Sequence, residues 1–487
     1  MISYTEVKKL NKKGNVIPIF IKMPADLVTP VAAYIKLASG QRESFLLESI
    51  EGGEKLARYS FLGFDPFLVV EGSHDSVTLH RNKRKEIIKV QPVEFIKRLF
   101  ASYRPVRVEG LPRFTGGGVG YFSYDCVRWL ERVPDTNPDN IVLPQMRIGL
   151  FSHIIAFDHL KQEIIVVANI IHDPKDRGLK AKYDEAVFRI EKVVKQLGIT
   201  KRSVVEKHNG DVKIAADYSK SRFMGMVRRA KQYIKEGDIY QVVLSQRWRV
   251  YSTTTPLSVY RRLRRINPSP YMYLIQFSDN AIIGSSPEML VRVEGHDVET
   301  RPIAGTRPRG KSQSEDEKLT FDLLNDTKEL AEHTMLLDLG RNDIGRVSEA
   351  GTVQVKDKMI IEKYSHVIHI VSSVVGRLKR RVSPIDALLA CFPAGTVTGA
   401  PKIRAMEIID ELEKLRRGVY AGAVAYLDFW GNLDSCITIR TLVKKDATYF
   451  VQAGAGIVAD SKPTREFRET EAKARALIEA VIGGENH

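Results

Sequence analysis

Residues 448–480 read TYFVQAGAGIVADSKPTREFRETEAKARALIEA. The first part, TYFVQAGAGIVA, is aromatic, β-branched or small, which predicts a strand that ends at the polar ADSKP segment. From Pro463 onward the apolar residues recur at helical spacing, so a helix is expected to follow. Glu466 and Glu469 lie three residues apart near the start of that helix, and both carboxylates therefore leave the same face.

Strands and helices arrive in groups along the rest of the chain. Residues 1–200 are mainly short strand-like runs such as FLLESI and EIIVVANII, followed by one helix, DEAVFRIEKVVKQLG. A polar segment separates this N-terminal β-rich region from a second region, residues 218–487, that mixes long helices with strands. In that region SEDEKLTFDLLNDTKELAEHTMLLDLG is expected to be one helix and CITIRTLV one strand. Because strict β-α-β alternation is missing, we predict an α+β fold with large antiparallel sheets.

The sequence is basic, so a nucleic-acid partner has to be considered. The 75 Lys and Arg residues exceed the 59 Asp and Glu residues, giving a formal charge of +16. A basic nucleic-acid-binding protein is therefore the alternative from another functional class. However, the clusters Arg81–Lys85, Arg261–Arg265 and Lys379–Arg381 lie far apart and lack a zinc-finger, RNA-recognition or helix-turn-helix pattern. Solvated faces are the preferred interpretation, and no nucleic-acid partner is expected.

Cysteine content and hydrophobicity predict the compartment. Cys126, Cys391 and Cys436 are the only cysteines, a set that provides neither a disulfide framework nor a C-x-x-C metal motif. The N-terminal residues lack a hydrophobic signal region, and no stretch reaches the roughly 18 apolar residues of a membrane span. We therefore expect a cytoplasmic protein with no membrane partner.

Two glycine-rich segments match nucleotide loops only in part. In GTVTGAPK, residues 395–402, Ala400 stands where a phosphate loop requires the glycine of its Gly-Lys-Ser/Thr end. After Gly454-Ala455-Gly456 the polar ADSKP segment stands where a dinucleotide fold would begin a helix. Nucleotide binding is not expected, although backbone amides beside these glycines can hold a smaller anion such as a carboxylate.

The most informative pattern is a pair of acid pairs. Glu329 and Glu332 lie three apart on a predicted helix, and Glu466 and Glu469 repeat that spacing. One such pair alone is typical of a solvated helix face. Two pairs brought together would form an oxygen-rich site suited to Mg²⁺, which binds through few carboxylates and keeps several waters.

Two further side chains are out of place in apolar strands. Arg440 lies within CITIRTLV, where a buried guanidinium needs an anion, either a ligand carboxylate or an internal Asp or Glu. His369 lies in a second apolar run and is either an acid–base group or a hydrogen-bonded core residue. The sequence pattern leaves both alternatives open.

Long strings of this sequence resemble the chorismate-utilising enzymes. The matching strings include IYQVVLSQR, GSSPEMLVRVEG, ETRPIAGTRPRG, ELAEHTMLLDLGRNDIGRV, ACFPAGTVTGAPKIRAMEII and QAGAGIVADSKPTREFRETEAKARAL, together with LLES and NPSPYM. They extend over nearly the whole chain. The resemblance implies a sandwich-like core of antiparallel sheets with helices packed outside, and it is strongest to the chorismate-aminating large subunits of anthranilate synthases.

Two positions discriminate among the reactions of that family. Relatives that add water to the ring carry a Lys as base where this sequence has Gln241, and a Gln cannot deprotonate water. Relatives that make aminodeoxychorismate for folate, the alternative function, carry a nucleophilic Lys where this sequence has Ala304. The resemblance therefore implies amination of chorismate at ring carbon 2 by ammonia, followed by loss of pyruvate.

The resemblance also implies a role for each matching residue. Mg²⁺ would be held by Glu332 and Glu469, with Glu329 and Glu466 beside them, and Glu288 would protonate the departing 4-hydroxyl. His369 would assist the elimination, and Thr396 and Lys402 would border the site beside Gln241. The remaining residues would bind the two substrate carboxylates: Gly305 and Thr306 the ring carboxylate, and Tyr420, Arg440 and the amides of Gly454, Ala455 and Gly456 the enolpyruvyl carboxylate.

The sequence lacks the Gly-x-Cys-x-Gly setting of a class I glutamine amidotransferase. We therefore expect ammonia to come from a separate amidotransferase subunit, in a hetero-oligomer of two large and two small subunits. Ser49, Pro270, Tyr271 and Met272 match the family's L-tryptophan feedback site, away from the catalytic centre. The alternative is a strand end packed against a Pro-rich turn.

Overall fold

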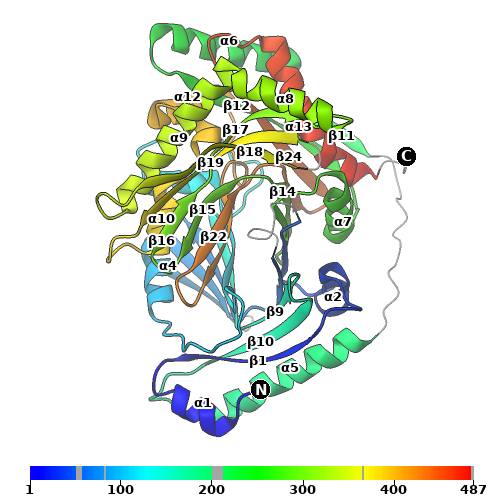
Figure 1. Cartoon of the computed structure of the whole chain (residues 1–487), viewed down its shortest axis with the longest axis vertical. Helices are drawn as coiled ribbons and strands as arrows, with labels where there is room; N and C mark the ends of the chain where they lie inside the picture. Colours follow the sequence, from blue (N-terminus) through cyan, green and yellow to red (C-terminus); the bar gives the residue numbers. More distant parts are fainter. Residues whose placement is uncertain (51–57, 82–83, 200–211, 365–366, 484–487) are drawn as a thin grey trace.

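The computed structural model describes residues 1–50, 58–81, 84–199, 212–364 and 367–483. Within these ranges the chain forms two large antiparallel sheets with helices packed around them (Figure 1). The predicted α+β fold with a sandwich-like core is therefore confirmed. Residues 200–211 of the polar boundary segment and part of the Arg81–Lys85 cluster lie outside the described residues, and the rest of the boundary segment includes a short strand, β11 (Lys213–Ala216). No helix of the described ranges is long and apolar enough to cross a membrane.

Each sheet combines strands from both ends of the chain. The first sheet has the order β1 (Val16–Pro24), β10 (Glu163–Ile171), β9 (His153–Asp158), β3 (Tyr59–Phe64), β2 (Ser44–Glu48), β13 (Tyr271–Gln276), β14 (Asn280–Ser286), β23 (Thr441–Lys445), β24 (Thr448–Ile457), β12 (Gln241–Tyr251) and β11 (Lys213–Ala216), with β20 (Gly399–Ala400) beside β12. The second has the order β17 (Ile303–Pro308), β19 (Val367–Arg377), β16 (Asp297–Thr300), β15 (Met289–Glu294), β22 (Leu433–Ile437), β21 (Ala423–Asp428), β7 (Gly117–Phe122), β8 (Met146–Phe151), β4 (Leu68–Ser73), β5 (Ser76–Arg81) and β6 (Arg84–Lys89), with β18 (Gln354–Lys363) beside β19.

The helices cover the outer faces of the sheets and the end near α9 and α13 (Figure 1). They are α1 (Tyr4–Leu10), α2 (Pro30–Leu37), α4 (Pro92–Ala101), the 3₁₀ helix η1 (Tyr124–Trp129), α5 (Leu179–Gly198), α6 (Lys220–Glu236), α7 (Pro256–Ile266), α8 (Gln313–Asn325), α9 (Thr327–Val347), α10 (Pro384–Ala390), α11 (Gly395–Thr398), α12 (Lys402–Glu413) and α13 (Pro463–Ile482).

The core follows from strand alternation. In β2, Phe45 packs between the two sheets with Tyr121 of β7 and Tyr426 of β21, all three buried. The next residue, Leu46, points to the opposite face and packs in a core that also contains residues of α2, α5, α7 and α13. Because successive side chains of a strand alternate between faces, β2 contributes to both layers of the sandwich.

Two predicted elements are each broken in the structure. The long helix expected over residues 314–340 is two helices, because the Asp326 carboxylate accepts hydrogen bonds from the amides of Lys328 and Glu329 and begins α9 there. The strand expected over residues 436–443 ends at Ile437 in the second sheet and resumes at Thr441 in the first. At Arg440, between them, φ is 50°, a left-handed conformation that a regular strand does not adopt.

Candidate active site

A cavity of about 590 Å³ lies between α9, α13 and strands of both sheets. Most of the predicted site residues line it: Gln241, Glu288, Gly305, Thr306, Glu329, Glu332, His369, Thr396, Tyr420, Arg440, Gly454, Gly456, Glu466 and Glu469. Two do not. The Lys402 ammonium lies 2.9 Å from the Asp343 carboxylate in an ion pair outside the cavity lining, and Ala455 is fully buried in the core around α6 and α12. Ala304, the position expected to exclude a lysine nucleophile, also lines the cavity.

The four predicted metal carboxylates reach the same cavity from two helices. Glu329 and Glu332 come from the first turns of α9, and Glu466 and Glu469 from the first turns of α13. Glu332 Oε1 accepts a hydrogen bond from Gln241 Nε2 (3.1 Å), and Glu469 Oε1 lies 2.8 Å from Lys473 Nζ. Burial raises the pKa of Glu329 and of Glu466, and the neighbouring carboxylate, Glu332 or Glu469, adds to each rise.

This donor set fits Mg²⁺. Within the described residues no three His, Cys, Asp or Glu side chains are close enough to form a complete metal centre. The two acid pairs nevertheless offer only oxygen ligands, and a divalent cation would stabilise their ionised form against the burial and the repulsion that raise the pKa of Glu329 and Glu466. Mg²⁺ typically takes one or two carboxylates and completes its shell with water and substrate oxygens.

Glu288 follows β14 and is buried in the cavity wall. Burial raises its pKa to about 8, and the neighbouring Thr396 hydroxyl and the Ile303 amide offset only part of that rise. The side chain is therefore a neutral carboxylic acid at pH 7 and can donate a proton. This protonation state depends on burial in the folded chain.

His369 of β19 faces the cavity beside β17. Its Nδ1 lies 3.1 Å from the Gly305 carbonyl oxygen and 3.1 Å from the Thr306 hydroxyl. A carbonyl oxygen can only accept, so Nδ1 carries the proton and the lone pair is on Nε2. Burial lowers the pKa of His369, and the nearby Arg440 lowers it further. A neutral imidazole with a free lone pair can act as a base near neutral pH.

Arg440 enters the cavity at the point where the chain crosses between the sheets. Its Nη1 donates to the Lys473 carbonyl oxygen (3.0 Å), and within the described residues no carboxylate lies within 4.0 Å of it. Of the two alternatives, an internal ion pair is therefore not observed. A Cβ at Gly454 would lie 2.6 Å from the Tyr420 hydroxyl, so only glycine lets that tyrosine approach β24 closely. The guanidinium, the phenol and the glycine strand form one wall able to hold an anion.

Comparisons with known proteins agree with this geometry. Residues 42–479 match the model of a family described as chorismate binding enzyme. The chain belongs to this family. It is 48% identical over 484 residues to "Anthranilate synthase component 1" of Acetivibrio thermocellus, covering 98% of this chain and 97% of that protein. The protein of the same description from Aquifex aeolicus (strain VF5) is 46% identical over 484 residues, covering 99% of this chain and 97% of that protein.

Two solved structures have the same fold. The crystal structure of anthranilate synthase component I from Streptococcus pneumoniae TIGR4 superposes with a TM-score of 0.79 at 36% identity, covering 94% of this chain and 99% of that chain. The menaquinone-specific isochorismate synthase of Escherichia coli superposes with a TM-score of 0.73 at 17% identity, covering 96% of this chain and 95% of that chain, and supports the fold alone.

The family motifs did not reveal most of the positive charge in the cavity. Four lining cations were not predicted: Arg307, Lys328, Arg465 and Lys473. With Arg440 they make five cations against the five glutamates that line the cavity. Arg307 is also paired with Asp322 and Asp326, both at 2.8 Å, so carboxylates largely balance these cations before any metal binds. The spacing of Lys473, four residues after Glu469 on α13, was the one available sequence signal for these cations.

A buried ion pair behind the cavity supports its wall. The Arg417 guanidinium donates to both oxygens of Glu413, at 2.8 and 2.6 Å. It also donates to the carbonyl oxygens of Val397 and Val243, both at 2.7 Å, and these two residues line the cavity. The same guanidinium lies 5.5 Å from the centre of the Tyr420 ring. One fully paired charge therefore connects α12, α11 and β12 with Tyr420.

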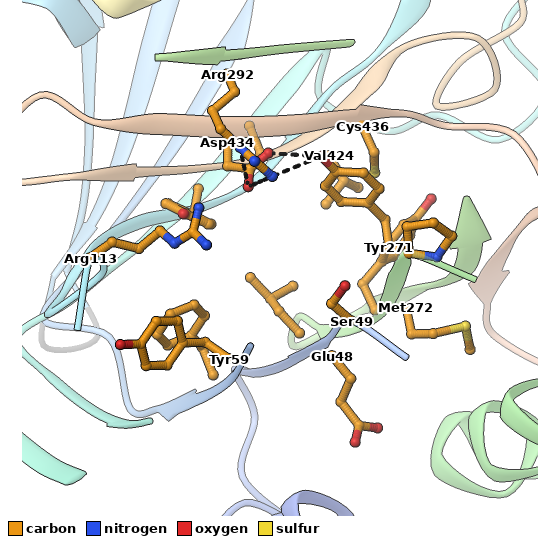
Figure 2. A pocket seen from close by; sticks show the side chains of 16 residues that line it. Glu48, Ser49, Tyr59, Arg113, Tyr271, Met272, Arg292, Val424, Asp434 and Cys436 are labelled. Atoms are coloured by element: carbon orange, nitrogen blue, oxygen red, sulfur yellow. Dashed lines mark hydrogen bonds and ion pairs between the residues drawn. The ribbon is translucent and has the colours of Figure 1, made fainter. Parts of the chain in front are cut away.

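The residues predicted to form the regulatory site line a second cavity, of about 70 Å³, between β2, β13 and β22 (Figure 2). Tyr271 donates to Asp434 (3.0 Å), which Arg292 also binds (2.8 Å). The Ser49 side chain faces the same space, whereas that of Met272 points away (Figure 2). Pro270 lines both this cavity and the large one.

Proposed function

We propose that this chain is the large subunit of an anthranilate synthase, which converts chorismate and ammonia to anthranilate and pyruvate. The observation that carries the proposal is the presence of Gln241 and Ala304 in a cavity that also contains the two acid pairs. The near full-length similarity to proteins described as anthranilate synthase component 1 supports it. The folate-pathway alternative is disfavoured, because Ala304 cannot act as a nucleophile.

The cavity residues match the charge of chorismate, which has two carboxylates. Glu332 and Glu469, with Glu329 and Glu466 beside them, would hold Mg²⁺, which neutralises the ring carboxylate when bound. Gly305 and Thr306, which line the cavity, would bind that carboxylate. Tyr420, Arg440 and the glycines of β24, which also line the cavity, would bind the enolpyruvyl carboxylate.

The amination needs one acid. The ammonia nitrogen forms a bond to ring carbon 2, the ring double bonds shift, and the bond from carbon 4 to its hydroxyl breaks. Glu288 donates its proton to that hydroxyl, which leaves as water. The new ammonium group then gives up one proton, which restores the Glu288 acid through solvent, and becomes an amine, so atoms and charges balance.

The elimination needs one base. His369, whose Nδ1 is bound to the Gly305 carbonyl, would use Nε2 to remove the hydrogen on ring carbon 2 while the bond from carbon 3 to the enolpyruvyl oxygen breaks. The electron pair of the broken C–H bond makes the ring aromatic, and the released enolpyruvate takes up a proton at its methylene carbon to become pyruvate. Aromatisation makes this step strongly downhill, so modest help from a neutral imidazole suffices.

Regulation and ammonia supply complete the proposal. The small cavity offers cationic and anionic groups, Arg113, Arg292 and Asp434, to an amino acid, and we assign it to L-tryptophan as feedback inhibitor. Inhibition requires tryptophan to bind an inactive arrangement more tightly than the active one. Ammonia would come from a separate glutamine amidotransferase, in an assembly of two large and two small subunits in the cytoplasm.

The test is an assay with chorismate, Mg²⁺ and an ammonium salt at alkaline pH. Anthranilate fluorescence that requires all three, and that falls when L-tryptophan is added, is the expected result. Accumulation of a non-aromatic amino product would favour the folate-pathway function instead.

A further inference from the structure

Arg247 of β12 is a buried cation that the proposed reaction steps do not use. It is only 3% exposed, and among the described residues no carboxylate lies within 4.0 Å of it. Asp217 acts on it from farther away but is paired with Arg249 at 2.7 Å. Glu413 is likewise paired with Arg417 at 2.6 Å. A guanidinium keeps its proton in a protein, and a buried charge without a close counter-charge is costly, so Arg247 needs an explanation.

One side chain separates Arg247 from the large cavity. Arg247 stands opposite Gln452 in the β12–β24 pair, and its Nε donates to Gln452 Oε1 (3.0 Å). Gln452, Gly454 and Gly456 are alternate residues of β24, and all three line the cavity. Residues opposite each other in a sheet share a face, and Gly454 lies about 7 Å along the strand from Gln452. The guanidinium therefore lies on the cavity face of the sheet, beside the glycines proposed to bind the enolpyruvyl carboxylate.

Neutral groups hold this guanidinium in place. Its Nη2 donates to the backbone carbonyl oxygens of Arg416 and Arg417, and its Nη1 has no hydrogen-bond partner among the residues that the structure describes. Gln452 is itself fixed, because its Nε2 donates to the Ser245 hydroxyl (2.7 Å). Carbonyl and amide oxygens are uncharged acceptors, so they orient the cation without cancelling its charge. The positive charge of Arg247 is therefore fixed in position and available to a nearby anion.

We propose that Arg247 attracts and orients the substrate carboxylate at the glycine wall through its fixed buried charge, an inference that rests on the proposed function. Arg247 is a positioning residue, because Gln452 lies between it and the ligand. Its charge acts through the protein interior, where screening is weaker than in water. Two unit charges about 10 Å apart interact there strongly enough to change a Kd about tenfold. Arg440, by contrast, lines the cavity and would contact the carboxylate itself.

The experiment measures the Kd of chorismate by calorimetry in the full-length protein, with Mg²⁺ and without ammonia, so that no turnover occurs. Arg247→Lys keeps the charge and loses the planar fork, whereas Arg247→Gln loses the charge and keeps a hydrogen-bond donor. We expect the Kd to rise about tenfold in Arg247→Gln and to stay within about twofold in Arg247→Lys. Arg247→Met, which also lacks the charge, takes the place of Arg247→Gln if that variant does not fold.

Arg404→Gln is the matched control. Arg404 belongs to α12, which packs on the opposite face of β12, against Val242 and Leu244. Its side chain is 37% exposed and is paired with Asp238 at 2.7 Å. The same change in net charge at this site is screened by solvent and should leave the Kd of chorismate within about twofold.

Two results in folded variants would overturn the proposal. An unchanged Kd in Arg247→Gln means that the charge does not reach the ligand. An equal rise in Arg247→Lys and Arg247→Gln means that the placement of Gln452, and not the charge, sets the affinity. A wild-type protein that neither binds chorismate nor forms anthranilate from chorismate and ammonium refutes the proposed function as well, which separates that failure from the other two.

Discussion

Replacing Glu288 by Gln gives the sharpest test of the acid that the site requires. The carboxyl has a pKa of about 8 in the folded chain against an ordinary value of 4.5. Because the folded-state pKa is raised, the contribution of Glu288 to stability is fully present below about pH 4.5 and is lost as the pH rises through about 8. Gln does not titrate, so Glu288→Gln keeps its stability over that interval.

The size of the effect follows from the two pKa values. Between pH 5 and pH 8 the free energy of unfolding of the wild-type protein should fall by about 3 to 4 kcal/mol relative to that of Glu288→Gln. Denaturant unfolding of both proteins at several pH values measures the difference, and titrations of all other groups cancel in it. A difference that stays constant with pH would refute the assignment of a buried neutral acid.

The catalytic rate should depend on the protonation state of Glu288. At constant free ammonia, the wild-type rate should fall on the alkaline side above about pH 8, as Glu288 loses its proton. Glu288→Gln should lower kcat by roughly 10²- to 10⁴-fold, the usual worth of a general acid, without a matching rise in the KM for chorismate.

Three other predictions follow from the contacts. Arg417→Met leaves Glu413 buried without its guanidinium partner and should lower the free energy of unfolding by about 3 to 5 kcal/mol in the same denaturant experiment. The double variant with Glu413→Met should recover most of that loss. An equal loss in the single and the double variant would contradict a buried-charge effect. Glu469→Gln should raise the Mg²⁺ concentration for half-maximal rate at least tenfold, and an unaltered Mg²⁺ titration would exclude it as a ligand. Ser49→Phe should fill the small cavity and abolish inhibition by L-tryptophan while kcat is retained; persistent inhibition would place the effector elsewhere.

Local patterns predicted most strands and helices but not the two breaks that shape the site. Strand β10 and helix α13 were predicted within a few residues, because their apolar spacing is unambiguous. The crossing at Arg440 was read as continuous strand, since a left-handed conformation at a non-glycine residue has no signature in residue type. The break at Asp326 was missed for a related reason: an aspartate that caps a helix is also common on a helix surface.

The candidate site was predicted as residue types, not as protonation states or partners. The two acid pairs were visible as spacing, but only the fold brings α9 and α13 to one cavity. Burial makes Glu288 an acid, and the Gly305 carbonyl selects the tautomer of His369. Lys402 was expected beside the cavity, yet its charge is bound by Asp343, a residue 59 positions away that no local pattern connects to it.

The way the two sheets are assembled has a consequence for how this chain acquires its structure. Strand β2 pairs with β13, and β7 pairs with β21. Because their partners lie more than 200 residues downstream, β2 and β7 cannot pair until those later strands have been synthesised. A fragment that begins at residue 218 would leave β13 and β21 with bare edges in the middle of each sheet, and such edges recruit other chains. We therefore expect the isolated C-terminal portion to aggregate on expression, and co-expression of the N-terminal portion to restore its solubility.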